Sequence, residues 1–350
     1  MDAPKSKKPR KSRYRSLVNR KNSLIDVAAE FNEEVKCIAY LEAMRWPEGV
    51  RCLKCDSARI SRFVRKGRSR INSKGEAVNS PDKHLYQCLA CKYQFAATTG
   101  TIFHDTHLPL HKWFQAVALM CDEKKGGSAM QLQRQLRIGS YRTAWYLNHR
   151  IRKAMEENPG SGPLKGVIEA DETYVGGKYD ARRKRGKYEK EPVFGIVERG
   201  GEVRTWHIPE VNRKQLFTRL KESVDVDTAL YTDESPLYKR VPEGLKHEIV
   251  NHSDKEYARG EVHTGTIDGY WSLVKRGIIG SFHRVSIKHL HRYLFEFQMR
   301  YNNRETADFF AVVVARLLIG SALRYKMLTS DPVPPSASGS SDPEPSGVPF

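Results

Sequence analysis

The chain has 350 residues, a length that predicts two or three domains rather than one. Its 60 Lys and Arg outnumber its 41 Asp and Glu, which gives a formal net charge of +19 and predicts a polyanionic partner, most often a nucleic acid. A hydrophobic content of 39% and a mean hydropathy of −0.61 exclude membrane spans. The longest apolar stretch, residues 309–320, is interrupted by Arg316 and is shorter than the roughly 20 residues that a span needs.

The two ends of the chain are expected to be disordered. Residues 1–25 form a predicted basic arm, because nine of the first 22 residues are Lys or Arg and only Asp2 is acidic. The arm lacks the apolar stretch of a secretory signal, so we expect a cytoplasmic, nucleoid-associated protein whose six cysteines stay reduced. Residues 328–350 contain no Lys or Arg and are rich in Pro, Ser and Gly, which predicts a disordered tail.

Residues 26–102 are predicted to combine a helix with a zinc ribbon. Cys52 and Cys55 form one CxxC pair, and Cys88 and Cys91 form a second pair, separated from the first by 32 residues. Four thiolates from two such pairs suit the tetrahedral coordination of a structural Zn²⁺. A redox function is the weaker alternative, since two pairs coexist and neither opens a thioredoxin-like unit.

Residues 103–157 are predicted to form an all-helical, DNA-binding region. A helix over 111–122 is followed by two shorter helices, which Ser128 and Ser140 can cap and which the Gly-containing turn RIGS joins. This pattern fits a helix-turn-helix, and an ordinary helical bundle fits it equally well. The basic residues of the region favour DNA, with Arg142 and Arg150 as the predicted contacts.

Residues 164–325 alternate strands with helices and predict an α/β domain, in which helices flank one mixed sheet. The expected strands are 166–171, two within 193–210, 228–234 and 247–253. The expected helices are 213–224, 266–276, 286–302 and 308–319.

Three aspartates of this block are placed where they could meet. Asp171 and Asp233 each end a predicted strand, and Asp268 lies near the start of a helix that could cross above the strand ends. Converging carboxylates suit two Mg²⁺ ions, because hard divalent cations prefer oxygen ligands. Glu172 and Glu234 adjoin two of the aspartates, and the alternation of side chains along a strand should turn them away from this site.

Over residues 30–325 the chain resembles the prokaryotic insertion-sequence DDE transposases, which place a zinc ribbon ahead of a ribonuclease-H-like domain. The resemblance rests on the two CxxC pairs, on residues 170–178 (ADETYVGGK), 231–234 (YTDE) and 263–277, and on the helix over 289–304. It implies a catalytic, Mg²⁺-binding triad of Asp171, Asp233 and Asp268. Lys275 would lie seven residues further along the helix of Asp268. The family usually has Glu where this chain has Asp268, whose side chain is one methylene shorter.

The resemblance implies a DNA transposase that performs metal-dependent cleavage and strand transfer of an insertion element. Its partners would be the terminal inverted repeats and the target DNA, bound by a homo-oligomer. Residues 178–190 hold seven basic residues against two acids and predict a DNA-binding loop. The predicted contacts in this loop are Lys178, Arg182, Arg183, Lys184 and Arg185. Two alternatives are a catalytically impaired copy that regulates through zinc-ribbon DNA binding, and a ribonuclease-H-type nuclease without strand transfer.

Overall fold

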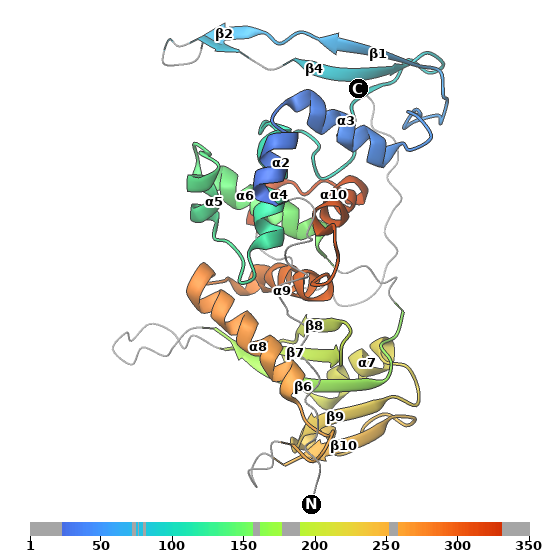
Figure 1. The fold of residues 1–350 in the computed structure, drawn as a ribbon, viewed down its shortest axis with the longest axis vertical. Coiled ribbons are helices and arrows are strands. Elements are labelled where there is room, and N and C mark those ends of the chain that lie inside the picture. The colour runs from blue at the N-terminus through green and yellow to red at the C-terminus, as the bar shows by residue number, and fades with distance from the viewer. Residues whose placement is uncertain are drawn as a thin grey trace, which may run out of the picture.

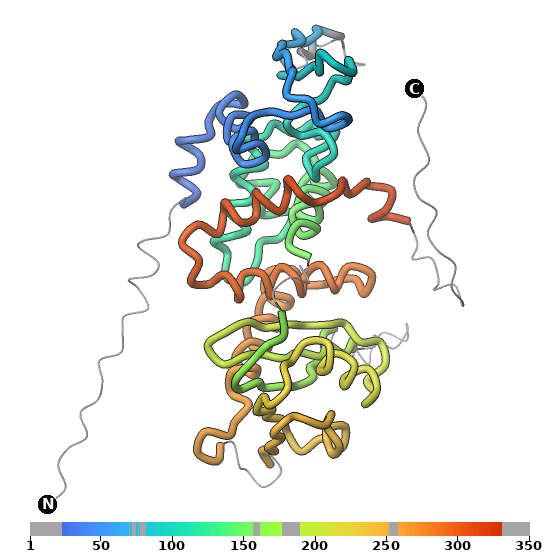
Figure 2. The backbone as a smooth tube through the Cα atoms, turned by 90° about the vertical axis from the view of Figure 1, so that its right-hand side faces the viewer, coloured from blue at the N-terminus to red at the C-terminus, as the bar shows by residue number. Residues whose placement is uncertain are grey.

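The computed structural model describes residues 23–330 apart from 72–74, 76, 80–81, 157–161, 177–189 and 252–257. Along its longest axis the molecule has an antiparallel ribbon at one end, a helical body in the middle and a five-stranded sheet at the other end (Figure 1). Figure 2 shows the same three levels from the side. In the described part of the chain, no helix combines the length and the apolar character that crossing a bilayer requires.

The ribbon joins the two CxxC pairs. It is preceded by α2 (Leu24–Glu30) and α3 (Glu34–Arg45). Its sheet has the order β1-β4-β5, formed by β1 (Ile60–Arg65), β4 (Lys83–Cys88) and β5 (Gln94–Phe95), and all pairs are antiparallel. A separate pair, β2 (Ser69–Ile71) with β3 (Ala77–Asn79), extends the hairpin. The buried rings of Tyr86 and Phe95 pack beside Cys52 and Cys88 and form a small core of their own.

The helical body consists of α2, α3, α4 (Leu110–Asp122), α5 (Ala129–Gln135), α6 (Tyr141–Ala154) and α10 (Phe309–Ile319), followed by α11 (Tyr325–Thr329). Although α10 follows the sheet domain in sequence, it packs against α3, α4 and α6. The rings of Phe31, Phe114 and Phe310 meet there, with centroids 4.8–6.0 Å apart. Because α10 is apolar on nearly every side, it needs the surrounding helices that this body supplies. Cys37 and Cys121, the two cysteines outside the CxxC pairs, lie in the same core.

The two helices and the turn predicted around residues 128–154 are present. Ser128 caps α5 by accepting a hydrogen bond from the Gln131 N–H at 3.1 Å, whereas the Ser140 side chain makes no capping bond to α6. Most of the second half of α6 is buried, and its exposed residues are Tyr141, Arg142 and Thr143 in the first turn. Only this first turn of α6 therefore offers a helix-turn-helix-like surface to a partner.

The five-stranded sheet has the order β10-β9-β6-β7-β8. Its strands are β6 (Val167–Val175), β7 (Glu191–Glu198), β8 (Val203–His207), β9 (Ala229–Asp233) and β10 (Lys246–Val250). β6, β9 and β10 are parallel, and β7 is antiparallel to β6 and β8. α7 (Arg213–Ser223) and the short 3-10 helix η2 (Pro236–Tyr238) pack on one face, and α8 (Gly265–Gly277) and α9 (Ile287–Asn302) pack on the other. The predicted fold class, a ribonuclease-H-like mixed sheet flanked by helices, is confirmed.

A buried cluster of charges ties the helical body to the sheet domain. Glu296 on α9 is fully buried and accepts a hydrogen bond from Arg152 Nε of α6 at 2.5 Å. Arg300 of α9 also pairs with Glu296, and it donates to the Met120 carbonyl of α4 at 3.1 Å. Removing one partner of such a buried set leaves an uncompensated charge, at a cost of about 3–5 kcal/mol. The two parts are therefore docked by specific contacts as well as by apolar packing.

Candidate active site and zinc ribbon

The four predicted cysteines meet where the ribbon joins the helical body. Their Sγ atoms all lie within 4.8 Å of one another, and the Cys52–Cys91 and Cys55–Cys88 pairs are each 3.6 Å apart. Zn–S bonds of about 2.3 Å give a tetrahedron with edges of about 3.8 Å, so these four sulfurs fit a structural Zn²⁺. The Lys54 N–H points at the Cys52 sulfur at 3.4 Å, as suits a thiolate.

The predicted aspartates come from three elements. Asp171 lies in the middle of β6 and not at its end as expected, because the strand continues to Val175 in register with β7. Asp233 ends β9, as predicted. β6 and β9 are parallel with Glu169 opposite Tyr231, so Asp171 and Asp233, each two residues further on, lie at the same level of adjacent strands.

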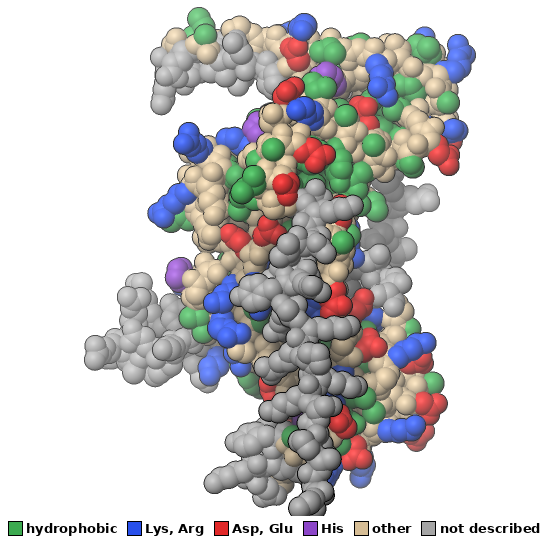
Figure 3. All heavy atoms as spheres, viewed as in Figure 1, with side chains coloured by type: hydrophobic (Ala, Val, Ile, Leu, Met, Phe, Trp, Pro, Cys, Tyr) green, Lys and Arg blue, Asp and Glu red, His purple; other side chains and the backbone are tan. Residues whose placement is uncertain are grey.

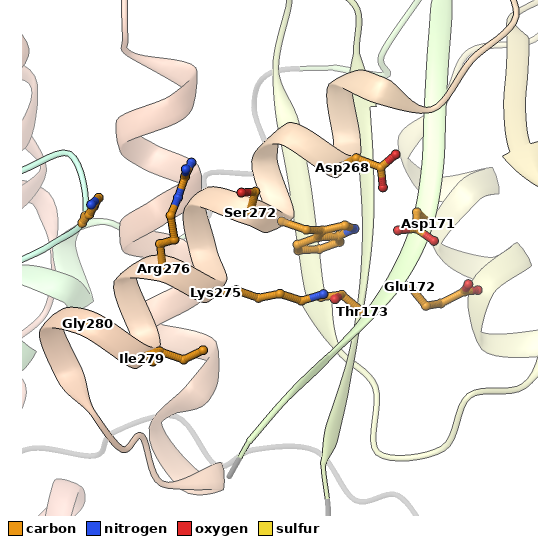
Figure 4. A pocket seen from close by; sticks show the side chains of 11 residues that line it. Asp171, Glu172, Thr173, Asp268, Ser272, Lys275, Arg276, Ile279 and Gly280 are labelled. Carbon is orange, nitrogen blue, oxygen red and sulfur yellow. The ribbon is translucent and has the colours of Figure 1, made fainter. Parts of the chain in front are cut away.

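Asp268 lies in the first turn of α8, which crosses β6 and β7. Figure 4 shows the Asp268 carboxylate directed toward Asp171. Burial raises the pKa of Asp171 to about 7, and the negative charges of Asp233 and Asp268 add to the rise. Three carboxylates that repel one another in this way are an oxygen donor set suited to a hard divalent cation, which would neutralise them.

A glycine in β7 lets α8 approach the sheet. Gly195 pairs with Asp171, and a Cβ at Gly195 would lie 2.5 Å from the Trp271 ring. The Trp271 side chain fills that space, is 3% exposed and packs α8 on the sheet. A side chain at position 195 would therefore have to displace the Trp271 ring, which packs α8 against the sheet.

A cavity of ≈ 590 Å³ opens beside the carboxylates. Asp171 and Asp268 line one part of it, and Lys275 and Arg276 of α8 line another. The remaining lining residues are Lys125, Glu172, Thr173, Trp271, Ser272, Ile279 and Gly280. Of the four predicted catalytic residues, Asp171, Asp268 and Lys275 therefore share one cavity, and Asp233 stands next to Asp171 outside its lining.

Comparison with known proteins gives one match to the zinc ribbon and one to the sheet domain. Residues 32–94 match the family described as a transposase zinc-ribbon domain, and residues 163–302 match the ISXO2-like transposase domain. A Halobacterium salinarum protein named as an uncharacterized protein in transposable element ISH50 is 29% identical over 289 residues, which cover 77% of this chain and 91% of that protein. The chain belongs to the zinc-ribbon insertion-sequence DDE transposases.

One residue of the transposase site escaped the sequence prediction. Glu169 is fully buried on the same face of β6 as Asp171. Its carboxylate accepts hydrogen bonds from the backbone N–H groups of Thr266 at 2.7 Å and Ile267 at 3.0 Å, and Arg199 Nε donates to it at 2.6 Å. N–H groups in the first helical turn have no partner within the helix, and an acid at that end is favourable. Glu169 thus fastens the turn of α8 that carries Asp268.

Glu172 lies on the other face of the strand, as alternation predicted. Its Oε1 accepts a hydrogen bond from the Tyr238 hydroxyl at 2.6 Å. Tyr238 is fully buried in the core on the α7 side. Burial raises the pKa of Glu172 to about 7, and the bond from Tyr238 opposes that rise. The Glu172 carboxylate is therefore held by Tyr238 on the α7 side of the sheet, although the residue also lines the cavity.

The predicted DNA contacts have different outcomes. Arg142 is exposed at the start of α6, with its guanidinium 5.7 Å from the centre of the Tyr325 ring. The prediction that Arg150 contacts DNA is wrong for this structure, because the side chain is 5% exposed, donates to the His104 carbonyl at 2.8 Å and packs over Trp113. The predicted loop residues Lys178, Arg182, Arg183, Lys184 and Arg185 lie outside the described residues.

The zinc assignment predicts that Cys88→Ser releases the metal. Four thiolates close a structural site, and the serine hydroxyl does not replace a thiolate at neutral pH. Elemental analysis of the purified chain should give about one Zn²⁺ per chain, and a fraction of that value for the variant. Cys37→Ser, which changes a buried cysteine outside the cluster, is the matched control and should keep its zinc. Full occupancy in Cys88→Ser would overturn the assignment.

Proposed function

We propose that this transposase catalyses metal-dependent cleavage of an insertion element and transfer of its 3′ end to target DNA. The observation that carries the proposal is the meeting of Asp171, Asp233 and Asp268 beside a cavity that also contains Lys275. A protein that only binds DNA needs no such set of carboxylates. The family match and the net charge of +19 support a DNA substrate.

The residues have distinct roles in this proposal. Asp171, Asp233 and Asp268 would hold two Mg²⁺ ions, which when bound supply activation of the attacking hydroxyl and stabilisation of the leaving oxygen. Strand β6 fixes Asp171, and Glu169 on the same strand fixes the first turn of α8. The spacing of Asp171 and Asp268 is therefore set by a single rigid element, which suits a reaction that is sensitive to small misplacements.

Lys275 would bind a phosphate of the DNA strand. Its side chain extends along the cavity toward β6 (Figure 4), two turns of α8 beyond Asp268. An ammonium in that place donates to a non-bridging phosphate oxygen and so orients the phosphodiester for in-line attack by water or by a 3′-hydroxyl. One site would then serve both the cleavage step and the joining step, without a covalent bond between protein and DNA.

The experiment that tests this function is a joining assay. A duplex with the terminal inverted repeat that flanks the gene, ending in a free 3′-hydroxyl, is incubated with plasmid DNA in Mg²⁺ or in EDTA. We expect joined products in Mg²⁺ alone. Cleavage without joining would favour the ribonuclease-H-type nuclease, and binding with neither reaction would favour the DNA-binding regulator.

The basic surfaces predict a DNA affinity that falls steeply with salt. Each phosphate that a Lys or Arg neutralises lowers the slope of log K against log salt by about 0.9. Removing residues 1–22, which carry nine basic residues, should flatten this slope and preserve the preference for the element end. Fluorescence anisotropy over a range of KCl concentrations measures both quantities. An affinity independent of salt would show that the positive charge serves something other than DNA.

An insertion element has two ends that must be joined to the target, so we also propose that the transposase acts as a homo-oligomer on DNA at the nucleoid. Light scattering of the complex with end duplexes should give a mass of at least two chains. A complex of one chain per duplex that still joins paired ends would contradict this proposal.

A further inference from the structure

The helical body contributes a residue to the cavity of the sheet domain. Lys125 lies in the turn between α4 and α5, whereas the other lining residues lie on β6, on α8 and on the π-helical turn η4 (Ile278–Phe282) that follows α8. The Lys125 side chain is exposed, and it lines the same cavity as Lys275 and Arg276. The space-filling view shows Lys and Arg side chains gathered over α8 where this helix meets the helical body (Figure 3).

Close backbone packing fixes the turn that carries Lys125. A Cβ at Gly277 of α8 would lie 2.6 Å from the Lys125 carbonyl oxygen. Gly126 has a φ of +77°, and a Cβ there would lie 2.5 Å from the Phe282 ring and 2.9 Å from Glu296. Glycine is needed at position 277 because a Cβ would collide with the Lys125 carbonyl, and at position 126 because of its positive φ and the side chains packed against it. The turn is thus seated on α8, η4 and α9, and Lys125 keeps its place relative to the cavity.

The charges of the cavity are separated along α8. Asp268 lies in its first turn and Lys275 and Arg276 in its last, and the rise of 1.5 Å per residue puts Asp268 and Lys275 about 10 Å apart along the axis. Successive phosphates of one strand rise by about 3.4 Å along the axis of B-DNA, so a strand with one phosphodiester at the carboxylates can place a nearby phosphate at Lys275. Among the ion pairs between described residues, none neutralises Lys125, Lys275 or Arg276. The phosphates of a DNA strand would neutralise these three positive charges.

We propose that Lys125 is a DNA-binding residue of the active site. Together with Lys275 and Arg276 it would bind backbone phosphates of the reacting DNA strand, next to the phosphodiester that faces the carboxylates. This inference rests on the proposed function, because it takes that strand as the substrate. In this proposal the helical body contacts DNA at the active site as well as at the start of α6. The α4–α5 turn positions the substrate strand at the site of reaction.

The adjacent residue provides a matched test. Lys124 has the same charge and is exposed, but it does not line the cavity. For Lys125→Ala we expect about a tenfold weaker affinity for the end duplex in EDTA, as for one charged hydrogen bond, and a salt slope smaller by about 0.9. Lys124→Ala should change affinity less than twofold, and Lys125→Arg should retain most of it. Circular dichroism and the Tm of each variant check that the fold is kept.

Strand length supplies the second measurement. Duplexes whose reacting strand is shortened stepwise from either end will at some length lack the phosphates that face Lys125. The affinity difference between Lys125→Ala and Lys124→Ala should vanish at that length and be present above it. Because binding in EDTA needs no catalysis, this difference persists even if the joining assay fails, so the two proposals fail separately. Equal affinities and equal slopes of the two variants at every strand length would overturn the proposal.

Discussion

Asp171→Asn and Asp233→Asn should each abolish Mg²⁺-dependent strand transfer while leaving binding to the element end nearly intact. The amide keeps the shape of the side chain but removes the negative charge that would hold the cations, so the rate should fall by on the order of 10²-fold or more. Asp268→Asn should have the same effect, because its carboxylate faces Asp171. Joined products are quantified on gels, and end binding is measured by anisotropy.

Glu172→Gln is the matched control for these variants. Glu172 adjoins Asp171 in sequence but accepts its hydrogen bond from Tyr238 on the opposite face, and a glutamine oxygen can accept the same bond. The control should therefore join DNA at close to the parental rate. If Asp171→Asn and Asp233→Asn cut and joined at the parental rate, the carboxylate site would be wrong. If Asp268→Asn alone left the joining rate unchanged, the third metal ligand would be a residue other than Asp268.

Glu169→Gln should both destabilise the chain and slow the reaction. The amide loses the ion pair with Arg199 and turns one N–H toward donors at the start of α8, where Glu169 accepts from Thr266 and Ile267. Breaking a buried pair in this way costs about 3–5 kcal/mol of the free energy of unfolding. Because the freed turn carries Asp268, we expect the joining rate to fall by a further factor of about 10 to 100 at equal folded fraction. Urea denaturation and the joining assay measure the two effects.

Glu296→Gln separates a loss of stability from a loss of positioning. Glu296 is as buried as Glu169 and is also paired with arginine, but it lies on α9 where this helix meets the helical body. This variant should lose a similar free energy of unfolding and keep its joining rate once the folded fraction is matched. If Glu296→Gln slowed joining as much as Glu169→Gln, the effect would be structural and the positioning role of Glu169 would be contradicted.

Local patterns predicted the sheet domain well. The strands around Asp171 and Asp233 and the helix of Asp268 were recognisable from apolar runs, turn signals and helical spacing, because these elements bury one continuous face. Alternation also gave the correct side for Glu172. The extent of β6 was underestimated, since its second half begins with three polar residues in a row, Asp171 to Thr173, and is held as a strand by its pairing with β7.

Contacts between distant segments could not be predicted. Arg150 has the appearance of a DNA contact in a basic helix, but the Ile102 and His104 carbonyls and the Trp113 ring, which come from other segments, bury it. Glu169 shares a strand face with Asp171, a spacing of two that could have identified it, but its partners on α8 lie 97 and 98 residues away in sequence. Lys125 reaches the cavity only because the helical body docks on α8 and α9.

The most direct measurement of the central claim is the metal dependence of Asp171→Cys in the joining assay. Mg²⁺ demands hard oxygen ligands, whereas the softer Mn²⁺ accepts sulfur more readily, so a true ligand position should show a change of metal preference. We predict that Asp171→Cys is inactive in Mg²⁺ and regains joining in Mn²⁺, while Glu172→Cys shows the same Mn²⁺-to-Mg²⁺ ratio as the parent chain. Equal activity of Asp171→Cys in the two metals would contradict a metal-binding role for Asp171.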